Sequence, residues 1–356
     1  MKDVAIIWAW ASWLFLWTLI PEKKNVLFIE QNETTGNKLL LSWKGRCNFS
    51  NQNVSKEHYY WDDIERLESL FNNFWTKEMI HLLKKNGIDI KQEDNGRLLL
   101  ASNKSKELHE FFLKRNEELW HKFLLGKKVQ SIKKEWEIFF IQLQNEQIET
   151  RNVVIACWWK TFPQIGGSDF IFHFANQYWI QIQEGSPGLC WIETKENLSS
   201  LSWSSVVATV VLKGKDNKSI YEKKGVVLFT HWWISWPVIF NLTLFLNRYI
   251  HDLKDLKIKI IIDWIEITKR LLGYLKAPKN LKNYTMTLNP QSLKDRETAK
   301  VMVWWIRFAE LTENFELKKI PWCYVIGEAI NITWETWGFN LQRCWTSAYQ
   351  CAKAFS

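Results

Sequence analysis

The sequence predicts an α/β fold that opens with a β-α-β unit. Residues 3–7 (DVAII) and 25–30 (NVLFIE) are short apolar runs typical of buried strands, and residues 11–20 have helical character up to Pro21. A strand, a helix and a strand within about 30 residues form such a unit. The 356 residues are 47% apolar and 24% charged, which excludes a disordered or collagen-like chain and predicts two or three domains.

Local patterns predict the next elements. Residues 76–86 have helical spacing, with Thr76 as the N-cap and Gly87 just past the end. The other elements expected up to residue 157 are a helix at 105–119, paired strands at 129–134 and 137–143, and a buried strand at 151–157.

The pattern of apolar, charged and turn-forming residues changes near residue 184 and again near residue 301. Short apolar runs (VVATVVL, GVVLFT) joined by Gly, Ser and Asn turns predict a small β unit, and residues 247–275 are charged and helical in pattern. Near Val301 the chain returns to strand and turn, and it closes with a helix at about 341–354. We therefore expect three segments, 1–183, 184–300 and 301–356.

Tryptophan outnumbers glycine in this chain, with 24 residues against 14. Trp8, Trp10 and Trp13 follow the first strand as W-A-W-A-S-W, which becomes G-A-G-A-S-G if each is read as glycine. That is the dinucleotide fingerprint G-x-G-x-x-G between a strand and a helix. Its glycines allow a tight turn, close approach of the backbone to a pyrophosphate and close helix–strand packing. Tryptophan disfavours positive φ, and its indole would fill the phosphate site.

Glycine in place of tryptophan also suits other turns. Trp120 follows a predicted helix, Trp136 lies between two predicted strands, and the pairs at 158–159, 232–233 and 304–305 would become Gly-Gly or Trp-Gly turns. UGA is a stop codon in the standard code, tryptophan in one variant code and glycine in another. We interpret the pattern as a gene that uses UGA for glycine but was translated with the tryptophan variant. The expected UGA positions are 8, 10, 13, 158, 159, 233, 236, 304, 305, 322, 334 and 337, with genuine tryptophan at 232 and 345.

Several further motifs become recognisable with that substitution. They are TGNKL at 35–39, SWKGRCN at 42–48, DNGRL at 94–98, ACWW at 156–159, FTHWWISWP at 229–237, VWWI at 303–306, GEA at 327–329 and TWETWGFNL at 333–341. Together they resemble, almost from end to end, the BaiN/YhiN-like family of NAD(P)/FAD-dependent oxidoreductases. Cys157 and Phe339 depart from that pattern, since the family has Thr and Tyr there. The resemblance implies a Rossmann-like FAD domain, with a parallel sheet plus a β-meander, made from both chain ends around an inserted β-barrel-like and helical domain.

The resemblance also implies roles for individual residues. The loop of Trp8, Trp10, Ala11, Ser12 and Trp13 would hold the FAD pyrophosphate, and Glu30, 20 residues past Trp10, would bind the adenosine ribose. The other residues implied to contact the cofactor are Lys38, Gly45, Arg46, Cys47, Asn48, Val129, Cys157, Trp158, Gly327, Glu328, Gly338, Asn340 and Leu341. The alternatives are a solvated carboxylate at Glu30, ordinary polar loop residues at 38, 46 and 48, a structural thiol at 47 and core packing at 129.

The best interpretation is a cytoplasmic FAD enzyme that acts on a small molecule. NAD(P)H would reduce the flavin, and flavin N5 would pass a hydride to an organic acceptor such as an enone. His231 or Ser235 could protonate the substrate, unless their motif is only a structural turn. The alternatives are a flavin-dependent amine oxidase, a tRNA-acting flavoprotein, a membrane-anchored non-enzymatic protein and, if the tryptophans are genuine, an inactive protein.

The patterns of charge and cysteine limit which partners we expect. The net charge of +9 comes without a basic stripe, so we interpret it as a lysine-rich surface and expect no stable nucleic-acid partner. The six cysteines form no CxxC pair, which predicts free thiols in a reducing compartment and no metal site. Residues 4–20 carry no charge and taken literally suit a membrane anchor, but their apolar character depends on four tryptophans, so no membrane partner is expected.

Overall fold

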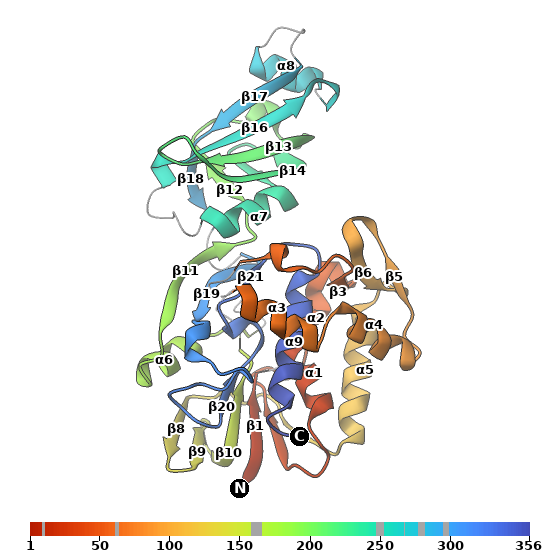
Figure 1. Ribbon diagram of the computed structural model, residues 1–356, viewed down its shortest axis with the longest axis vertical. Helices are drawn as coiled ribbons and strands as arrows, with labels where there is room; N and C mark the ends of the chain where they lie inside the picture. The colour runs from red at the N-terminus through yellow and green to blue at the C-terminus, as the bar shows by residue number, and fades with distance from the viewer. Residues whose placement is uncertain are drawn as a thin grey trace. The chain divides into compact units, whose positions relative to one another are not determined.

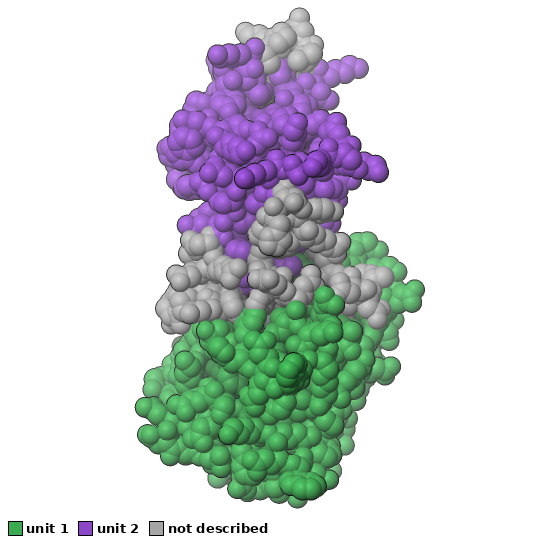
Figure 2. All heavy atoms as spheres, turned by 90° about the vertical axis from the view of Figure 1, so that its left-hand side faces the viewer, with its two compact units in different colours: residues 1–184, 304–356 green, residues 185–303 purple. Residues whose placement is uncertain are grey.

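The structure is a computed structural model that describes residues 1–8, 11–60, 64–157, 166–246, 253–266, 268–276, 282–294 and 299–356. The chain forms two compact units, shown in different colours in Figure 2. Unit 1 consists of residues 1–184 and 304–356, and unit 2 of residues 185–303. Unit 1 is therefore assembled from both ends of the chain.

A seven-stranded sheet forms the centre of unit 1. Its strands are β1 (Lys2–Ile7), β2 (Val26–Ile29), β7 (Lys122–Leu124), β8 (Ser131–Glu135), β9 (Ile138–Gln142), β10 (Gln147–Ile155) and β20 (Cys323–Val325). The order is β7-β2-β1-β10-β9-β8, with β20 also pairing with β10. β7, β2, β1 and β10 pair in parallel, and β20 is also parallel to β10. β9 pairs antiparallel with both β10 and β8. The predicted parallel sheet plus β-meander is confirmed.

Three helices of unit 1 pack against one another: α1 (Ala11–Leu19), α5 (Ser105–Glu118) and α9 (Phe339–Ala352) (Figure 1). The α1 sequence ASWLFLWTL carries no charge, and its first seven residues are buried, as expected of a helix that is apolar all round. The uncharged run at 4–20 is thus divided between β1 and α1. In the described parts of the chain, no helix has the length and apolarity needed to cross a membrane.

Smaller elements complete unit 1. They are α2 (Asn37–Leu41), η1 (Ser42–Gly45), β3 (Asn48–Asn51), η2 (Lys56–His58), β4 (Tyr59–Tyr60), α3 (Ile64–Asn73), α4 (Thr76–Lys85), β5 (Ile90–Gln92), η3 (Asp94–Gly96), β6 (Arg97–Leu100), α6 (Phe170–Gln177), η8 (Phe308–Glu310), η9 (Gly327–Ala329) and β21 (Thr333–Trp334). β3, β6 and β5 form a small sheet, and β21 pairs with β4. β11 (Ile182–Gly188) and β19 (Val301–Ile306) pair with each other, and each crosses the boundary between the units.

Unit 2 is built on a second seven-stranded sheet. Its strands, in sheet order, are β17 (Asn283–Leu288), β16 (Lys257–Asp263), β13 (Ser205–Lys213), β14 (Ser219–Phe229), β15 (Trp233–Ser235), β12 (Ile192–Thr194) and β18 (Pro290–Leu293). Alternate residues of the long strands enter one apolar core, which also contains residues of α7 (Pro237–Leu246) and α8 (Lys269–Leu275). This alternation leaves the opposite sheet face without those helices.

The structure corrects three local predictions. Residues 257–263 (KIKIIID) form strand β16 rather than a helix, because its β-branched isoleucines alternate with period two and enter the sheet core. Trp304 and Trp305 lie within strand β19 rather than in a turn. The N-cap of α4 is Trp75, and Thr76 instead donates its hydroxyl hydrogen to the backbone oxygen of Asn51.

Candidate functional site

The loop after β1 is where the sequence predicts a phosphate-binding turn. Trp8 follows β1 with φ of 67°, is 1% exposed, and donates its backbone N–H to the oxygen of Ile29 at 2.8 Å. Its ring packs against Phe170 with centroids 4.6 Å apart. A positive φ is costly for a bulky L-residue and free for glycine. The backbone at position 8 therefore has a conformation that favours glycine, although a buried indole is attached to it. Trp10 lies outside the described residues.

Ser12 and Trp13 begin helix α1 directly after this turn. The hydroxyl of Ser12 is buried without a hydrogen-bond partner in the structure. Trp13 packs edge-on against Phe28 of β2, with centroids 4.9 Å apart. The third glycine of the fingerprint normally lets the helix lie close to the strand at this position. A buried, unpartnered donor at a helix N-terminus suits an anionic ligand.

Glu30 lies just past the carboxyl end of β2 and is 1% exposed. Its Oε1 accepts hydrogen bonds from the backbone N–H and the side-chain amide of Asn32, at 2.8 and 2.6 Å. The carboxylate is held in place by its own loop rather than solvated. A fixed carboxylate at this position is the group that binds a ribose hydroxyl in dinucleotide folds.

Lys38, Glu328 and Asn340 come from three distant segments and meet in one cluster. Lys38 of α2 and Glu328 of η9 form an ion pair with 2.6 Å between Nζ and Oε2, and their side chains are 13% and 3% exposed. Asn340, in the first turn of α9, donates to the other carboxylate oxygen of Glu328 at 2.9 Å. The structure thus brings together three residues that the resemblance assigns to the cofactor.

Gly327 and Gly338 flank this cluster with positive φ, 68° and 97°. A Cβ on Gly338 would collide with the backbone oxygen of Ser50 in β3. The adjacent amide of Asn48 is 2% exposed, and neither of its polar atoms has a hydrogen-bond partner in the structure. The Oδ1 atom of Asn340 is also buried and unpartnered. Orphaned buried amides are costly, so a polar ligand beside them is the simplest account of their presence.

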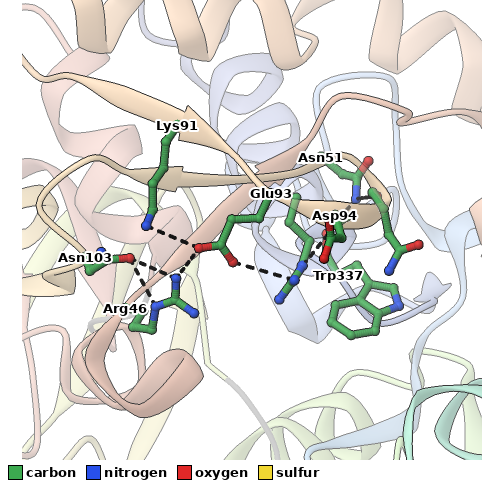
Figure 3. Close-up of polar contacts among 9 residues, drawn as sticks. Arg46, Asn51, Lys91, Glu93, Asp94, Asn103 and Trp337 are labelled. Atoms are coloured by element: carbon green, nitrogen blue, oxygen red, sulfur yellow. Dashed lines mark hydrogen bonds and ion pairs between the residues drawn. The ribbon is translucent and has the colours of Figure 1, made fainter. Parts of the chain in front are cut away.

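Arg46 is held by residues of the small sheet and the loop that follows it. Its guanidinium donates to Glu93, and Asn103 accepts from its Nε and Nη2 at 3.1 and 2.9 Å (Figure 3). Lys91 lies 3.2 Å from the same carboxylate. Hydrogen bonds from Arg46 and then from Lys91 lower the pKa of Glu93. This network fixes Arg46 beside β5, and its contact with a cofactor stays a prediction.

The remaining predicted contact residues lie in buried segments of unit 1. Gly45 ends η1 with φ of 84°, and Val129 precedes β8 in the core. Cys47 and Cys157 are buried, and burial raises both thiol pKa values, to about 12 for Cys47. All six cysteines are free, as predicted, and all six are buried. Leu341 is buried near the start of α9, and Trp158 lies outside the described residues.

Positive φ singles out tryptophan throughout the molecule. Sixteen non-glycine residues of the described chain have positive φ, and eight of them are Trp8, Trp120, Trp136, Trp179, Trp203, Trp236, Trp322 and Trp337. Four of these are among the most exposed apolar side chains, from 75% at residue 203 to 95% at residue 136. Tryptophan has no affinity for this conformation, which belongs to glycine and to small polar residues. The sequence predicted glycine at six of these positions and missed 179 and 203.

The indole nitrogens separate the buried tryptophans into two groups. Trp345 in α9 donates its Nε1–H to the oxygen of Phe49 at 2.8 Å, as a genuine buried tryptophan normally does. The Nε1 atoms of Trp13, Trp17 and Trp334 are buried without a partner. Trp345 was expected to be genuine, and positions 13 and 334 were expected to be glycine. The hydrogen-bond pattern agrees with that division.

His231 and Ser235 belong to unit 2; His231 precedes strand β15, and Ser235 is its last residue. His231 is exposed, and its Nδ1 lies 3.3 Å from the hydroxyl of Ser202. Ser235 is 7% exposed and precedes Trp236, whose φ is 93°. The glycine-like backbone before α7 matches the predicted turn motif. The catalytic role of His231 and Ser235 stays a prediction.

Arg343 is a buried cation that the sequence motifs did not reveal. It is 1% exposed, donates to the oxygens of Ile330 and Ile332, and lies 3.6 Å from the ring centroid of Trp334. Its Nε and Nη2 atoms have no partner in the structure. Burial lowers its pKa. An arginine among the apolar residues of the last predicted helix was the only signal available.

The Lys38–Glu328 pair gives a direct test of the cluster. Lys38→Met should lower the free energy of unfolding by about 3 kcal/mol, because it leaves a buried carboxylate without its cation. Lys56→Met is the matched control, since Lys56 pairs with Glu68 on the surface and should change stability little. Urea denaturation measures both. Equal effects of the two substitutions would contradict the buried pair.

Several described residues supply groups that suit a flavin–adenine dinucleotide. A fixed carboxylate for a ribose, a helix N-terminus after a tight turn, and buried unpartnered atoms at Ser12, Asn48 and Asn340 supply the donors and acceptors that such a cofactor needs. One residue does not fit: Trp8 places a bulky, buried indole at the position of the first fingerprint glycine. Glycine at this position would remove the conflict.

Comparisons with known proteins show the family of the chain. The family model described as "HI0933-like protein Rossmann domain" matches residues 2–354. The chain is 24% identical to a "Ribosomal RNA dihydrouridine synthase" of Escherichia coli strain K12, covering 99% of this chain and 97% of that protein. It is 21% identical to a "3-dehydro-bile acid delta(4,6)-reductase" of Clostridium scindens, covering 66% of this chain and 57% of that protein.

Solved structures show the same fold. The 3-ketosteroid-delta4-(5alpha)-dehydrogenase from Rhodococcus jostii RHA1 matches with a TM-score of 0.53 at 11% identity, covering 100% of this chain and 96% of that chain. At this identity the match concerns the fold alone. The family model, in contrast, spans nearly the whole sequence. The chain therefore belongs to the HI0933-like family of Rossmann-fold flavoproteins.

Proposed function

We propose that this chain is an FAD-dependent reductase of a carbon–carbon double bond conjugated to a carbonyl, and that its substrate is a uridine of ribosomal RNA. The observation that carries the proposal is the end-to-end similarity to two proteins named ribosomal RNA dihydrouridine synthase, over 97% and 98% of their lengths. The C5=C6 bond of uracil is conjugated to the C4 carbonyl. It is therefore an enone-like acceptor of the kind that the sequence predicts.

The reaction is balanced by one hydride and one proton. NAD(P)H is the proposed electron donor, and FAD, when bound, supplies the hydride to C6 of uracil from N5. A proton is then added at C5 to give dihydrouridine. His231 and Ser235 are the proposed proton donors, because both belong to the segment that resembles the family motif, with a positive φ at the adjacent Trp236. This proposal departs from the expectation of no stable nucleic-acid partner.

Residues of unit 1 would bind and orient the cofactor. Glu30 would hold the adenosine ribose, and Ser12 with the α1 N-terminus would hold the pyrophosphate. Glu328, fixed by Lys38 and Asn340, would hold the ribityl chain. The N-terminus of α9 would stabilise the negative charge that the flavin pyrimidine ring gains on reduction, since partial positive charge gathers at a helix N-terminus.

Glycine in place of tryptophan is part of the proposal. Positive φ at eight tryptophans and unpartnered indole nitrogens at three support it. The choice between glycine and tryptophan matters most for cofactor binding in the phosphate loop. With glycine at 8, 10 and 13 the backbone N–H groups can approach a pyrophosphate, and with tryptophan they cannot.

The test uses the full chain with glycine at the eight positive-φ positions and at 10, 13, 158, 159 and 334. Incubated with NADPH and ribosomal RNA transcribed without modification, it should form dihydrouridine, detected by mass spectrometry of the digested nucleosides. The chain as written should form none. If the protein oxidises NADPH with small enones but forms no dihydrouridine in any ribosomal RNA, the substrate is a small molecule and not RNA.

A further inference from the structure

The positive charge of the protein is concentrated in unit 2. Residues 185–303 carry 18 Lys and Arg against 10 Asp and Glu, whereas unit 1 carries 29 against 28. Almost all of the formal charge of +9 therefore belongs to the inserted unit. The lysines are spread along the sequence of this unit, and the sheet brings several of them to one face.

The sheet of unit 2 presents lysines on the face opposite its apolar core. Along β16, Ile258, Ile260 and Ile262 enter the core, and Lys257 and Lys259 alternate with them. Lys213 of β13 is the register partner of Lys257. By the same alternation, the outward-facing positions nearby include Lys224, paired with Thr209, and the exposed Thr285 and Thr287 of β17. The exposed Glu222 of β14 lies on the same face, across Val211 from Lys259.

The turn between β13 and β14 extends this face. Lys215 and Lys218 lie in it and are each 84% exposed. We call Lys213, Lys215, Lys218, Lys224, Lys257 and Lys259 the lysine face. Figure 1 shows β13, β14, β16 and β17 next to one another in the inserted unit.

The charge on the lysine face is only partly balanced by acidic side chains. Lys224 pairs with Asp263 at 3.1 Å, and Lys215 and Lys218 lie 3.7 and 3.4 Å from Asp255 and Asp216. Among the described residues, Lys257 and Lys259 have no acidic partner within 4.0 Å. Like charges directly across two antiparallel strands, as at 213 and 257, destabilise a sheet. A polyanion on this face would remove that repulsion.

We infer that the lysine face is the surface on which unit 2 binds the RNA substrate. Lysines along neighbouring strands contact phosphates without reading sequence, and threonine hydroxyls add donors between them. The inference rests on the proposed function, and it assigns the positioning of RNA to unit 2. Base chemistry then remains with the cofactor site.

The experiment compares two double substitutions in the full chain. Lys257→Gln/Lys259→Gln removes two charges from the lysine face, and Lys84→Gln/Lys85→Gln removes two exposed charges from α4 of unit 1. Filter binding to unmodified ribosomal RNA is measured from about 0.05 to 0.3 M salt. The face variant should bind about 25-fold more weakly at 0.1 M, with a salt slope about 1.4 units shallower, because each phosphate contact on a single strand contributes about 0.7. The α4 variant should match the unsubstituted chain.

Other readouts separate the causes of failure. Lys215→Gln/Lys218→Gln alters only an exposed turn, so its weaker RNA binding cannot come from misfolding. Equal losses in the face and α4 variants, no loss in either face variant, or equally tight binding to vesicles of anionic phospholipid would each overturn the inference. Dihydrouridine formation is scored separately. If RNA binding depends on the lysine face but no dihydrouridine forms, the proposed reaction is refuted and the RNA-binding surface stands. If dihydrouridine forms but RNA binding does not depend on the lysine face, only the proposed surface is refuted.

Discussion

Replacing Trp8, Trp10 and Trp13 by glycine is expected to turn a chain that does not retain FAD into one that does. The turn after β1 already has a positive φ at position 8, so glycine there needs no backbone change. Glycine at these positions lets the backbone of the turn approach a pyrophosphate closely, which is the role of the fingerprint glycines. Two charge-assisted hydrogen bonds at about 1.5–3 kcal/mol each correspond to a gain in FAD affinity of roughly a hundredfold or more. Flavin absorbance after gel filtration and a fluorescence titration measure it.

The control for this experiment is a second triple substitution, Trp120→Gly, Trp136→Gly and Trp179→Gly. These residues also have positive φ but are exposed at turns outside the phosphate loop. They should leave FAD affinity unchanged. If the chain as written binds FAD as tightly as the loop variant, the phosphate loop does not require glycine and our account of it is wrong.

The same control triple should stabilise the protein. Each exposed tryptophan with positive φ costs about 1–2 kcal/mol in backbone strain. Glycine removes this strain, but it also raises the conformational entropy of the unfolded chain, which offsets part of the gain in stability. For three positions the net gain in the free energy of unfolding is about 2 kcal/mol. In a unit of this size, that raises the melting temperature by about 4–8 °C, which differential scanning calorimetry detects.

Trp345→Gly should have the opposite sign. Trp345 is fully buried within helix α9 and has its indole hydrogen bond satisfied by Phe49. Its removal should cost at least 3–5 kcal/mol, as for other large-to-small substitutions in a core. Stabilisation at 345, or destabilisation by the control triple, would show that φ does not identify the positions where glycine belongs.

Local signals predicted most of unit 1. Apolar runs bounded by turn residues gave β1, α1 and β2 in the right order, and the alternating patterns before residue 157 gave the meander. The spacing of Trp8, Trp10 and Trp13 predicted the loop even though the residues themselves are unsuited to it. Spacing survives a change of residue type because it reflects the geometry of the backbone.

Contacts between distant segments could not be read from the sequence. The meeting of Lys38 with Glu328, and of Arg46 with Glu93, depends on how the chain returns to the sheet. Strand β16 was missed because its flanking lysines suggested a charged helix, although its isoleucines have strand spacing. Trp179 and Trp203 follow no motif, and only their backbone angles revealed them.

The division of unit 1 between the two ends of the chain sets the order of events during synthesis. The core of unit 2 is complete once residue 303 has left the ribosome, so that unit can fold early. Strand β20, Glu328 and helix α9 come last, and the cluster around Lys38 cannot close before them. A nascent chain therefore displays its lysine face while the cluster around Lys38 is still incomplete.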